Sequence, residues 1–170
     1  MTRTTREEVV QAAGRLFAQR GYDATSMRDL GREVGLLGSS LYAHVEGKQE
    51  LLVEVVMRGS EHFAASAAAA TAGDGTAAEQ LRAFIAGHVA VVLDHLGVAR
   101  TFLNEARSLD PEFRVRVIAA RDTYEATLRS ILSAGIIDGS FRKNLDPKLE
   151  GIFILSILTS NIAFAALHTA

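Results

Sequence analysis

Cysteine is absent from the 170 residues of this chain. Without it the chain can form no disulfide framework, no thiolate metal site and no cysteine nucleophile. The N-terminal residues, MTRTTREEVV, are polar, and no apolar run follows them as it would in a secretory signal. Both observations fit a protein of the reducing cytoplasm, and that is the location we expect.

The chain also lacks a strong charge of either sign. Its formal net charge is −2, so composition alone does not indicate a nucleic-acid binder. Residues 1–48 hold 7 Lys+Arg and 6 Asp+Glu, a balance of +1, which leaves −3 for residues 49–170. The asymmetry has the sign expected of an N-terminal DNA-binding part, but a DNA-binding prediction has to rest on a motif.

No stretch alternates between apolar and polar residues for long enough to predict a β-strand. Apolar residues recur instead at helical spacing, and 48% of the chain is hydrophobic, enough for a small module and a larger domain. We therefore predict an all-α fold, with a three-helix head over residues 1–47 and a helical body over residues 48–170. A long helix from Lys48 is expected to connect them.

Short polar signals place the expected helix boundaries. Capping-box patterns begin at Ser26 and Thr76 and at either Thr4 or Thr5, and each has an acidic residue three positions later. Asp110-Pro111 and Asp146-Pro147 each combine an N-cap residue with a proline suited to the first helical position.

The stretch 25–48, TSMRDLGREVGLLGSSLYAHVEGK, carries the most specific pattern of the chain. A short helix from about Met27 to Val34, a turn at Gly35 and a second short helix from about Gly38 to His44 are predicted. Two short helices joined by a glycine-containing turn are typical of a helix-turn-helix, which places its second helix in the DNA major groove.

The segment GREVGLLGSSLYAHVEGKQELL resembles the DNA-binding signature of the tetracycline-repressor (TetR) family of bacterial transcriptional regulators. The preceding F-x-x-x-G-Y-x-x-T-S-M-x-D-L, from Phe17 to Leu30, fits the same family, and the resemblance covers residues 9–52. It implies a homodimer that binds a palindromic double-stranded operator, usually to repress, and that a small molecule in the body releases. Neither a cofactor nor a metal is implied.

The resemblance also implies DNA contacts at particular positions. Phosphate contacts are expected at the start of the first motif helix and at the start of the long helix, where charge and helix dipole favour an anion. Base and backbone contacts are expected from the second motif helix. The predicted set is Thr25, Ser26, Arg28, Leu37, Gly38, Ser39, Ser40, Tyr42, His44 and Lys48.

The sequence departs from the family pattern at three positions around the recognition helix. Leu37 stands where Ser or Thr is usual, Gly38 where Lys or Arg is usual, and Val45 where Phe is usual. A poor N-cap costs about 1 kcal/mol in typical hosts, so we expect a loosely held helix. Leu37 is predicted to make an apolar contact instead, for example with a thymine methyl group.

In the body, an apolar wall with a few polar groups is predicted to bind a small hydrophobic effector. The candidate residues, which would otherwise simply be core, are Phe84, His88, Val92, Phe102, Leu103, Phe113 and Tyr124. His88 and His95 lie seven residues apart near Asp94, but this is not the spacing of two metal ligands on one helix. A metal site is therefore not expected.

The last predicted helix, from Lys148 to about His168, has no Asp, Glu, Lys or Arg after Gly151. A membrane span would need about 20 predominantly apolar residues, and Ser156, Thr159, Ser160 and Asn161 interrupt this run. We predict instead a helix buried on both sides, with Phe153, Ile157 and Phe164 facing the body and Ile154, Leu158 and Ile162 facing a second subunit. The family usually has one more helix at this interface, and the sequence ends at Ala170.

No enzyme motif is present: there is no phosphate-binding glycine loop and no dinucleotide fingerprint, and no acid is placed to orient His44 beside Ser39 and Ser40. The main prediction is an effector-responsive repressor. Two alternatives are a DNA-binding protein without an effector and a structural or membrane-associated helical protein.

Overall fold

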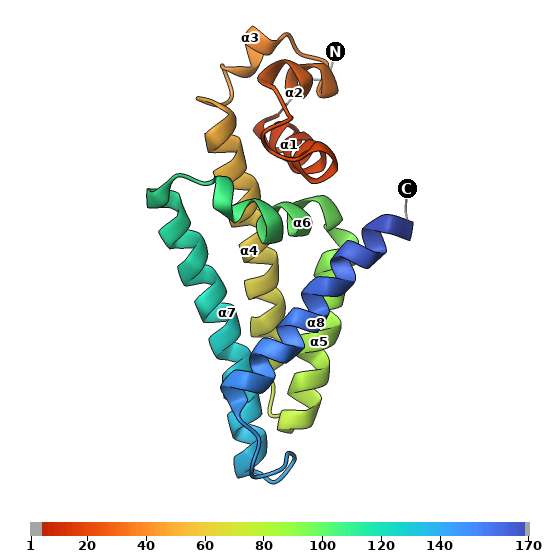
Figure 1. The fold of residues 1–170 in the computed structure, drawn as a ribbon, viewed down its shortest axis with the longest axis vertical. Coiled ribbons are helices and arrows are strands. Elements are labelled where there is room, and N and C mark those ends of the chain that lie inside the picture. Colours follow the sequence, from red (N-terminus) through yellow and green to blue (C-terminus); the bar gives the residue numbers. More distant parts are fainter. Residues whose placement is uncertain (1–4, 169–170) are drawn as a thin grey trace. The chain divides into compact units, whose positions relative to one another are not determined.

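The structure, a computed structural model, describes residues 5–168; of residues 38, 103, 104, 106, 107 and 161–168 it describes the backbone only. Every regular element in this part of the chain is a helix, which confirms the all-α prediction (Figure 1). In chain order the elements are α1 (Arg6–Arg20), α2 (Met27–Glu33), α3 (Gly38–Leu41), α4 (Lys48–Thr71), α5 (Ala77–Asp94), α6 (Leu96–Asn104), the 3-10 helix η1 (Glu105–Ser108), α7 (Pro111–Ile137) and α8 (Pro147–His168).

Contacts divide the chain into two compact units, which are described separately. Unit 1 comprises Met1–Ser60 and Gly97–Val117, and unit 2 comprises Glu61–Leu96 and Ile118–Ala170. Helix α4 begins at Lys48, where the predicted body begins, but its first half packs with the N-terminal helices. The functional boundary at residue 48 stays a prediction.

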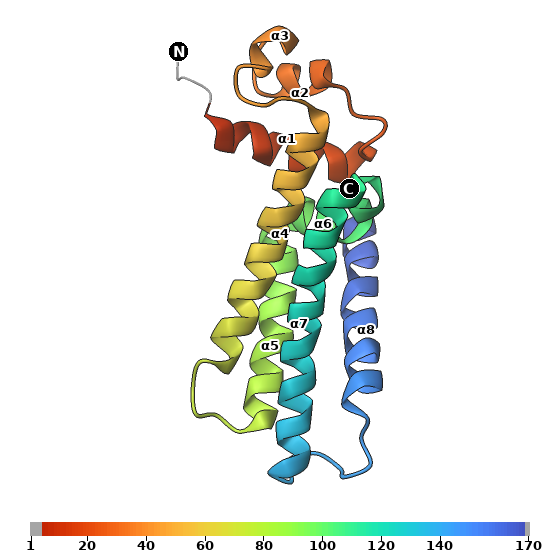
Figure 2. The same cartoon turned by 90° about the vertical axis from the view of Figure 1, so that its left-hand side faces the viewer.

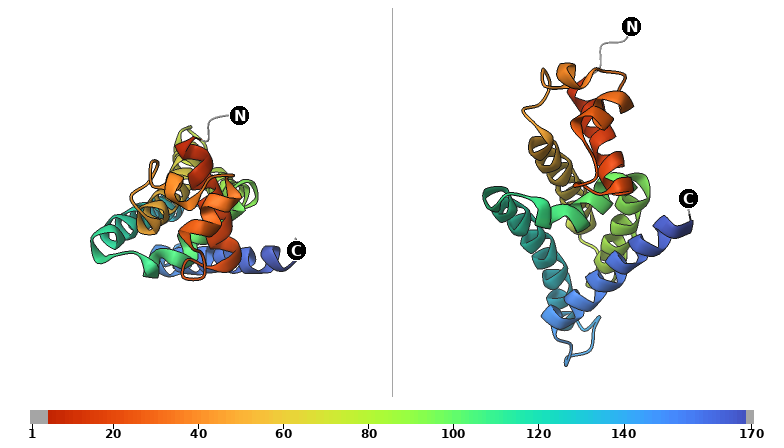
Figure 3. Two further views of the ribbon diagram at one scale, coloured as in Figure 1. Left: turned by 90° about the horizontal axis from the view of Figure 1, so that it is seen from above. Right: turned by 45° about the horizontal axis from the view of Figure 1, so that its top comes forward.

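Local polar signals fix the helix starts of unit 1. Thr5 and Ser26 each form a complete capping box, in which side chain and backbone bond reciprocally with the acidic residue three positions later. Gly35 has a φ of 69°, a left-handed conformation that glycine adopts without steric cost, and it turns the chain from α2 into α3. Figure 3 shows α1, α2 and α3 gathered beside the first half of α4.

Helix α6 packs in unit 1 through close backbone approaches. A Cβ on Gly97 would lie 3.3 Å from the carbonyl oxygen of Gly14 in α1, and one on Gly59 in α4 would lie 2.7 Å from Cβ of Phe102. Thr101 also donates its hydroxyl to the Gly14 carbonyl, at 3.3 Å. Helix α6 from Gly97 onward therefore packs with α1 and the first half of α4 in unit 1.

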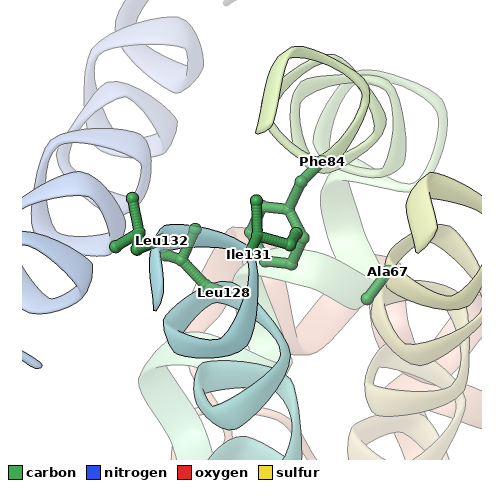
Figure 4. Close-up of a cluster of buried hydrophobic side chains, with 5 residues drawn as sticks. All are labelled: Ala67, Phe84, Leu128, Ile131 and Leu132. Atoms are coloured by element: carbon green, nitrogen blue, oxygen red, sulfur yellow. The ribbon is translucent and has the colours of Figure 1, made fainter. Parts of the chain in front are cut away.

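Unit 2 is a helical bundle of the second half of α4 with α5, α7 and α8, in which α4 and α8 lie on opposite sides of α5 and α7 (Figure 2). Its core joins residues from three of these helices: Ala67 of α4, Phe84 of α5, and Leu128, Ile131 and Leu132 of α7 (Figure 4). Helix α8 contacts α5 and begins as predicted, with the Asp146 carboxylate accepting from the backbone N–H groups of Lys148 and Leu149.

The two faces of α8 are the reverse of the prediction. Ile154 packs against the core of unit 2 and Leu158 is buried, whereas Phe153 and Ile157 are 54% and 63% exposed. Gly151 lies on the same inward face, against Leu128 and Arg129 of α7, and the residues at i+3 and i+7 share that face. The side chains of Ile162 and Phe164 lie outside the described residues.

Within the described part of the chain, no single helix has both the length and the apolar character of a membrane span. Helices α5 and α6 meet those criteria only when taken together across the break between them.

Candidate functional site

The turn before α3 and α3 itself present a row of exposed side chains in unit 1. Leu37 is 75% exposed and Tyr42 is 56% exposed, and Ser39 and Ser40 are also exposed. Leu41 and Val45 are buried at 0% and 3%, so they anchor the short helix. We call the row Leu37, Ser39, Ser40 and Tyr42 the reading row.

Helix α3 has the weak start that the sequence predicts. Leu37 occupies its N-cap position and makes no side-chain hydrogen bond to the helix. The α-helical part is only Gly38–Leu41, shorter than the predicted 38–44. Beyond it the chain continues in turns, held by hydrogen bonds from the N–H groups of His44 and Val45 to the Leu41 carbonyl.

The predicted phosphate contacts at the start of α2 differ in their availability. Arg28 and Ser26 are exposed, and Ser26 is engaged in the α2 capping box with Asp29. Thr25 is only 1% exposed, and its hydroxyl donates to the Gly21 carbonyl at 2.8 Å. The side chain of Thr25 thus holds the end of α1, and a DNA contact from this residue stays a prediction.

Lys48 is held at the start of α4 by Tyr22. Its ammonium donates to the Tyr22 carbonyl oxygen at 2.9 Å and lies 4.1 Å from the centroid of the Tyr22 ring. The Tyr22 hydroxyl in turn donates to Gln49 at 2.7 Å. Tyr22 was absent from the predicted site residues, although the Gly-Tyr pair of the family pattern marks it.

Arg6 is a second positioning residue that sequence reasoning missed. Its guanidinium donates to the carbonyl oxygen of His44 at 2.5 Å and pairs with Glu50 and Glu54 of α4 at 2.5 and 2.9 Å. Hydrogen bonding from Arg6 lowers the pKa of the Glu50 carboxyl. The chain after α3 is thereby tied to α1 and α4, but no local sequence pattern signals contacts over such separations.

In unit 2, three of the predicted effector residues come together. Phe84 and His88 of α5 are 0% and 3% exposed, and both pack against Tyr124 of α7. The Nδ1 atom of His88 lies 2.9 Å from the Tyr124 hydroxyl. Phe63 of α4 completes the group, with ring centroids 4.8 Å from His88 and 5.6 Å from Tyr124. We call Phe63, Phe84, His88 and Tyr124 the ring cluster.

Burial controls the charge of this cluster. It lowers the pKa of His88 to about 4 and raises the pKa of Tyr124. Both side chains are therefore neutral at physiological pH.

The other predicted effector residues are not placed in the ring cluster. Val92 is buried on α5, whereas Phe102 lies against Gly59 and, like the half-buried Phe113, belongs to unit 1. The side chain of Leu103 lies outside the described residues. His95 is exposed and stacks on His62, with ring centroids 3.9 Å apart, and no metal-binding group of three ligands occurs among the described residues.

Unit 1 also contains a cavity of about 290 Å³ that the sequence did not predict. The end of α1, from Phe17 to Gly21, lines one side, and Arg100, Thr101 and Glu105 line the other. Its lining is polar and includes Glu105, which accepts from the backbone N–H of Tyr22 at 3.4 Å.

Two family models match the chain. Residues 9–55 match "Bacterial regulatory proteins, tetR family", and residues 74–162 match "Tetracyclin repressor-like, C-terminal domain". The transcriptional repressor KstR2 of Rhodococcus jostii is 30% identical over 152 residues, which cover 88% of this chain and 74% of KstR2.

Solved structures show the same fold. The TetR family regulator PfmR from Thermus thermophilus is 34% identical, with a TM-score of 0.86 over 95% of this chain and 86% of PfmR. AibR, solved in complex with isovaleryl coenzyme A and operator DNA, is 23% identical, with a TM-score of 0.82 over 90% of this chain and 83% of AibR. The chain therefore belongs to the TetR family of bacterial transcriptional regulators.

Proposed function

We propose that two copies of this chain bind a palindromic operator in the cytoplasm through the reading row, and that an apolar effector entering unit 2 releases the DNA. The observation that carries the DNA-binding half is the exposure of Leu37 and Tyr42, which flank the short helix α3, while Leu41 and Val45 are buried. Large exposed side chains beside a short helix whose opposite face is buried are available to contact DNA.

Two positively charged side chains of unit 1 are available to bind the phosphate backbone of DNA. Arg28 is exposed at the start of α2, and Lys48, at the start of α4, is oriented by Tyr22. An ammonium group has three N–H donors, so one bond to the Tyr22 carbonyl leaves two for phosphate oxygens. Ser39 and Ser40 bond almost any base or phosphate, so they support contact without specifying a sequence.

We propose the exposed apolar stripe of α8 as the dimer interface, in place of Ile154 and Leu158. Leu149, Ile152, Phe153 and Ile157 are 50%, 44%, 54% and 63% exposed. They recur at intervals of three and four residues and so share one helix face. A contiguous apolar face of this kind on a helix is typical of a protein–protein contact.

The effector is proposed to bind at the ring cluster. Its walls are aromatic, and its polar groups are limited to one imidazole and one phenol, which favours a mostly apolar molecule. AibR was solved with isovaleryl coenzyme A, an acyl group on a carrier, and this supports an acyl or similarly apolar effector here. Phe63 lies on α4, the helix that begins at Lys48. An effector that displaces Phe63 would therefore shift the helix that carries Lys48, a proposed phosphate contact.

A salt titration tests the proposed DNA contacts on a duplex enriched from a random pool. Lys48→Ala should lower the slope of log affinity against log salt by about 2 per dimer, one phosphate contact from each copy. Tyr42→Phe should weaken binding while leaving the slope unchanged, because a phenol releases no counterion. Unchanged slopes and affinities in both variants would contradict the assignment.

A repressor without an effector is the second candidate, because the ring cluster is closed, with Phe84 and His88 almost fully buried. A compound that releases the selected duplex and raises the melting temperature of the free protein supports the first candidate. Compounds that bind the protein but leave the duplex bound support the second.

A further inference from the structure

The ring cluster contains a polar atom without a partner. Nε2 of His88 is buried and makes no hydrogen bond within the described part of the chain. Leaving a buried polar group unpaired costs about 1–3 kcal/mol, so such groups in native proteins call for an explanation. Because the His88 ring is 97% buried in an aromatic cluster, ordinary surface solvation does not pair this atom.

The two neutral tautomers of His88 differ in which hydrogen-bonding groups they leave unpaired. If the Tyr124 phenol donates to Nδ1 of His88, both of these groups are satisfied and Nε2–H is the one orphan. If Nδ1–H donates to the phenol instead, Nε2 is an unpaired acceptor and the phenolic O–H has to find an acceptor outside the pair. The first arrangement satisfies both Nδ1 and the phenol within the pair, which favours the tautomer with the proton on Nε2.

The surroundings of Nε2–H restrict what it can bind. A carboxylate would place a charge against Phe63 and Phe84 beside a neutral imidazole, at a high desolvation cost. A hydroxyl group of the ligand would bring an O–H donor of its own. The Tyr124 oxygen could not accept from that donor, because it lies by Nδ1, on the opposite edge of the imidazole ring. A carbonyl oxygen accepts without donating and carries no net charge.

We propose that His88 recognises the effector through its carbonyl oxygen, to which Nε2–H donates a hydrogen bond. This rests on the proposed function, because it assumes that the effector enters unit 2 at the ring cluster. Acyl thioesters and ketones both present such an oxygen on an apolar frame, and the experiment separates them. Tyr124 is a positioning residue: its hydroxyl fixes the tautomer that makes Nε2 a donor.

The tautomer can be measured without any ligand. A two-bond ¹H–¹⁵N correlation spectrum of the full chain, with His88→Gln to assign the signal, distinguishes the two neutral forms. We expect the proton on Nε2 at pH 7 in the wild type and a mixture of both forms in Tyr124→Phe. A proton on Nδ1 in the wild type would overturn the proposal.

Ligand recognition is tested with pairs of probes that differ only in the oxygen, using calorimetry on the full chain. One pair is dodecanoyl-CoA and its thioether S-dodecyl-CoA, and the other is androstan-3-one and androstane. In the wild type, one carbonyl probe should bind about tenfold more tightly than its oxygen-free partner, as expected for a buried hydrogen bond. The pair that shows the preference identifies thioester or ketone as the source of the oxygen.

Two variants assign the preference to His88. His88→Leu should bind both members of the pair equally, and His88→Gln should recover part of the preference because its amide can donate from a similar position. Equal binding in the wild type, a preference retained in His88→Leu, or no binding of either carbonyl probe would contradict the proposal.

Operator release separates this proposal from the one it rests on. If S-dodecyl-CoA releases the duplex as well as dodecanoyl-CoA does, the effector function stands and the carbonyl contact is refuted. If the carbonyl probe binds with the predicted preference but the duplex stays bound, the contact stands and the proposed release is refuted.

Discussion

At the scale of single residues, the structure distinguishes groups that the sequence alone leaves equivalent. Thr25 and Ser26 are adjacent hydroxyl residues, yet one hydroxyl is buried against the Gly21 carbonyl and the other caps α2 at the surface. The capping pattern reveals Ser26 because it is local, whereas the partners of Arg6 in α4 follow from packing between helices and have no local signal.

The pair His88 and Tyr124 should show strong coupling in stability. Tyr124→Phe removes the partner of Nδ1 and leaves the ring with a second unpaired nitrogen, so it should cost about 1–2 kcal/mol in the free energy of unfolding. Adding His88→Leu removes both unpaired nitrogens and should recover most of that loss. Urea titrations of the two single variants and the double variant measure the coupling, and additive effects would contradict the hydrogen bond.

His88 should also make stability depend on pH. Its pKa in the folded chain is about 4, below its ordinary value of 6.5, so the unfolded chain binds more protons between these values. Stability is therefore full above about pH 6.5 and falls as the pH drops toward 4, by about 2 kcal/mol between pH 7 and pH 5. His88→Gln should flatten this part of the curve in urea titrations, and an unchanged slope in that variant would assign the loss to other groups.

At the scale of elements, helix starts were predictable and helix faces were not. Ser26, Thr76 and Asp146 each specify a boundary through bonds to neighbours within three residues. The faces of α8 could not be read from the sequence because residues 151–170 are apolar all round and define no preferred side. The orientation is seen only in the tertiary packing, where Ile154 lies against the core of unit 2 and Leu158 is buried.

Glycine positions test the packing of α6 in unit 1. An alanine Cβ at Gly59 would lie 2.7 Å from Cβ of Phe102, so α4 or α6 must shift. Overpacking of about 1–3 kcal/mol outweighs the helix propensity gained, and Gly59→Ala should destabilise the protein by about 1 kcal/mol.

Gly151→Ala is the matched control, because its Cβ would meet Arg129 at an ordinary 3.6 Å. It should stabilise the protein by about 0.5–1 kcal/mol through helix propensity alone. Equal stabilisation by both substitutions in thermal unfolding would refute the close contact between α4 and α6.

Leu37→Ser separates helix capping from DNA contact in α3. Serine at this N-cap position should stabilise the helix by about 0.5–1 kcal/mol. If Leu37 contacts a thymine methyl group, operator affinity should nevertheless fall by about three- to tenfold. Thermal unfolding and gel retardation measure the two effects separately, and unchanged operator affinity would remove Leu37 from the reading row.

At the scale of the whole molecule, the sequence predicted the class correctly because the motif over residues 17–52 is specific. The predicted effector residues come together only in part: Phe84, His88 and Tyr124 are neighbours, but Phe102 and Phe113 belong to unit 1. Helix α6 packs on α1 through Gly14 and Gly97. The apolar residues of a helix do not by themselves indicate which neighbouring helix they pack against.

The dimer is expected to depend on the exposed stripe of α8. Ile157→Glu would bury two uncompensated carboxylates at the interface, so the dimer dissociation constant should rise by at least about 100-fold. Ile137→Glu makes the same change at a position that is 87% exposed and outside the stripe, and it should leave the dimer intact. Sedimentation velocity measures both, and dimers of equal stability would refute this interface.

Two copies of this chain are proposed to bind one palindrome through the reading row. Selecting the bound duplexes from a random pool of DNA tests this binding mode. We predict that the wild type enriches two inverted half-sites at fixed spacing. Ile157→Glu should lose this enrichment, and Ser40→Ala should alter the preference at one or two base pairs of each half-site. Enrichment of unpaired half-sites by the wild type, or of no sequence at all, would contradict the account.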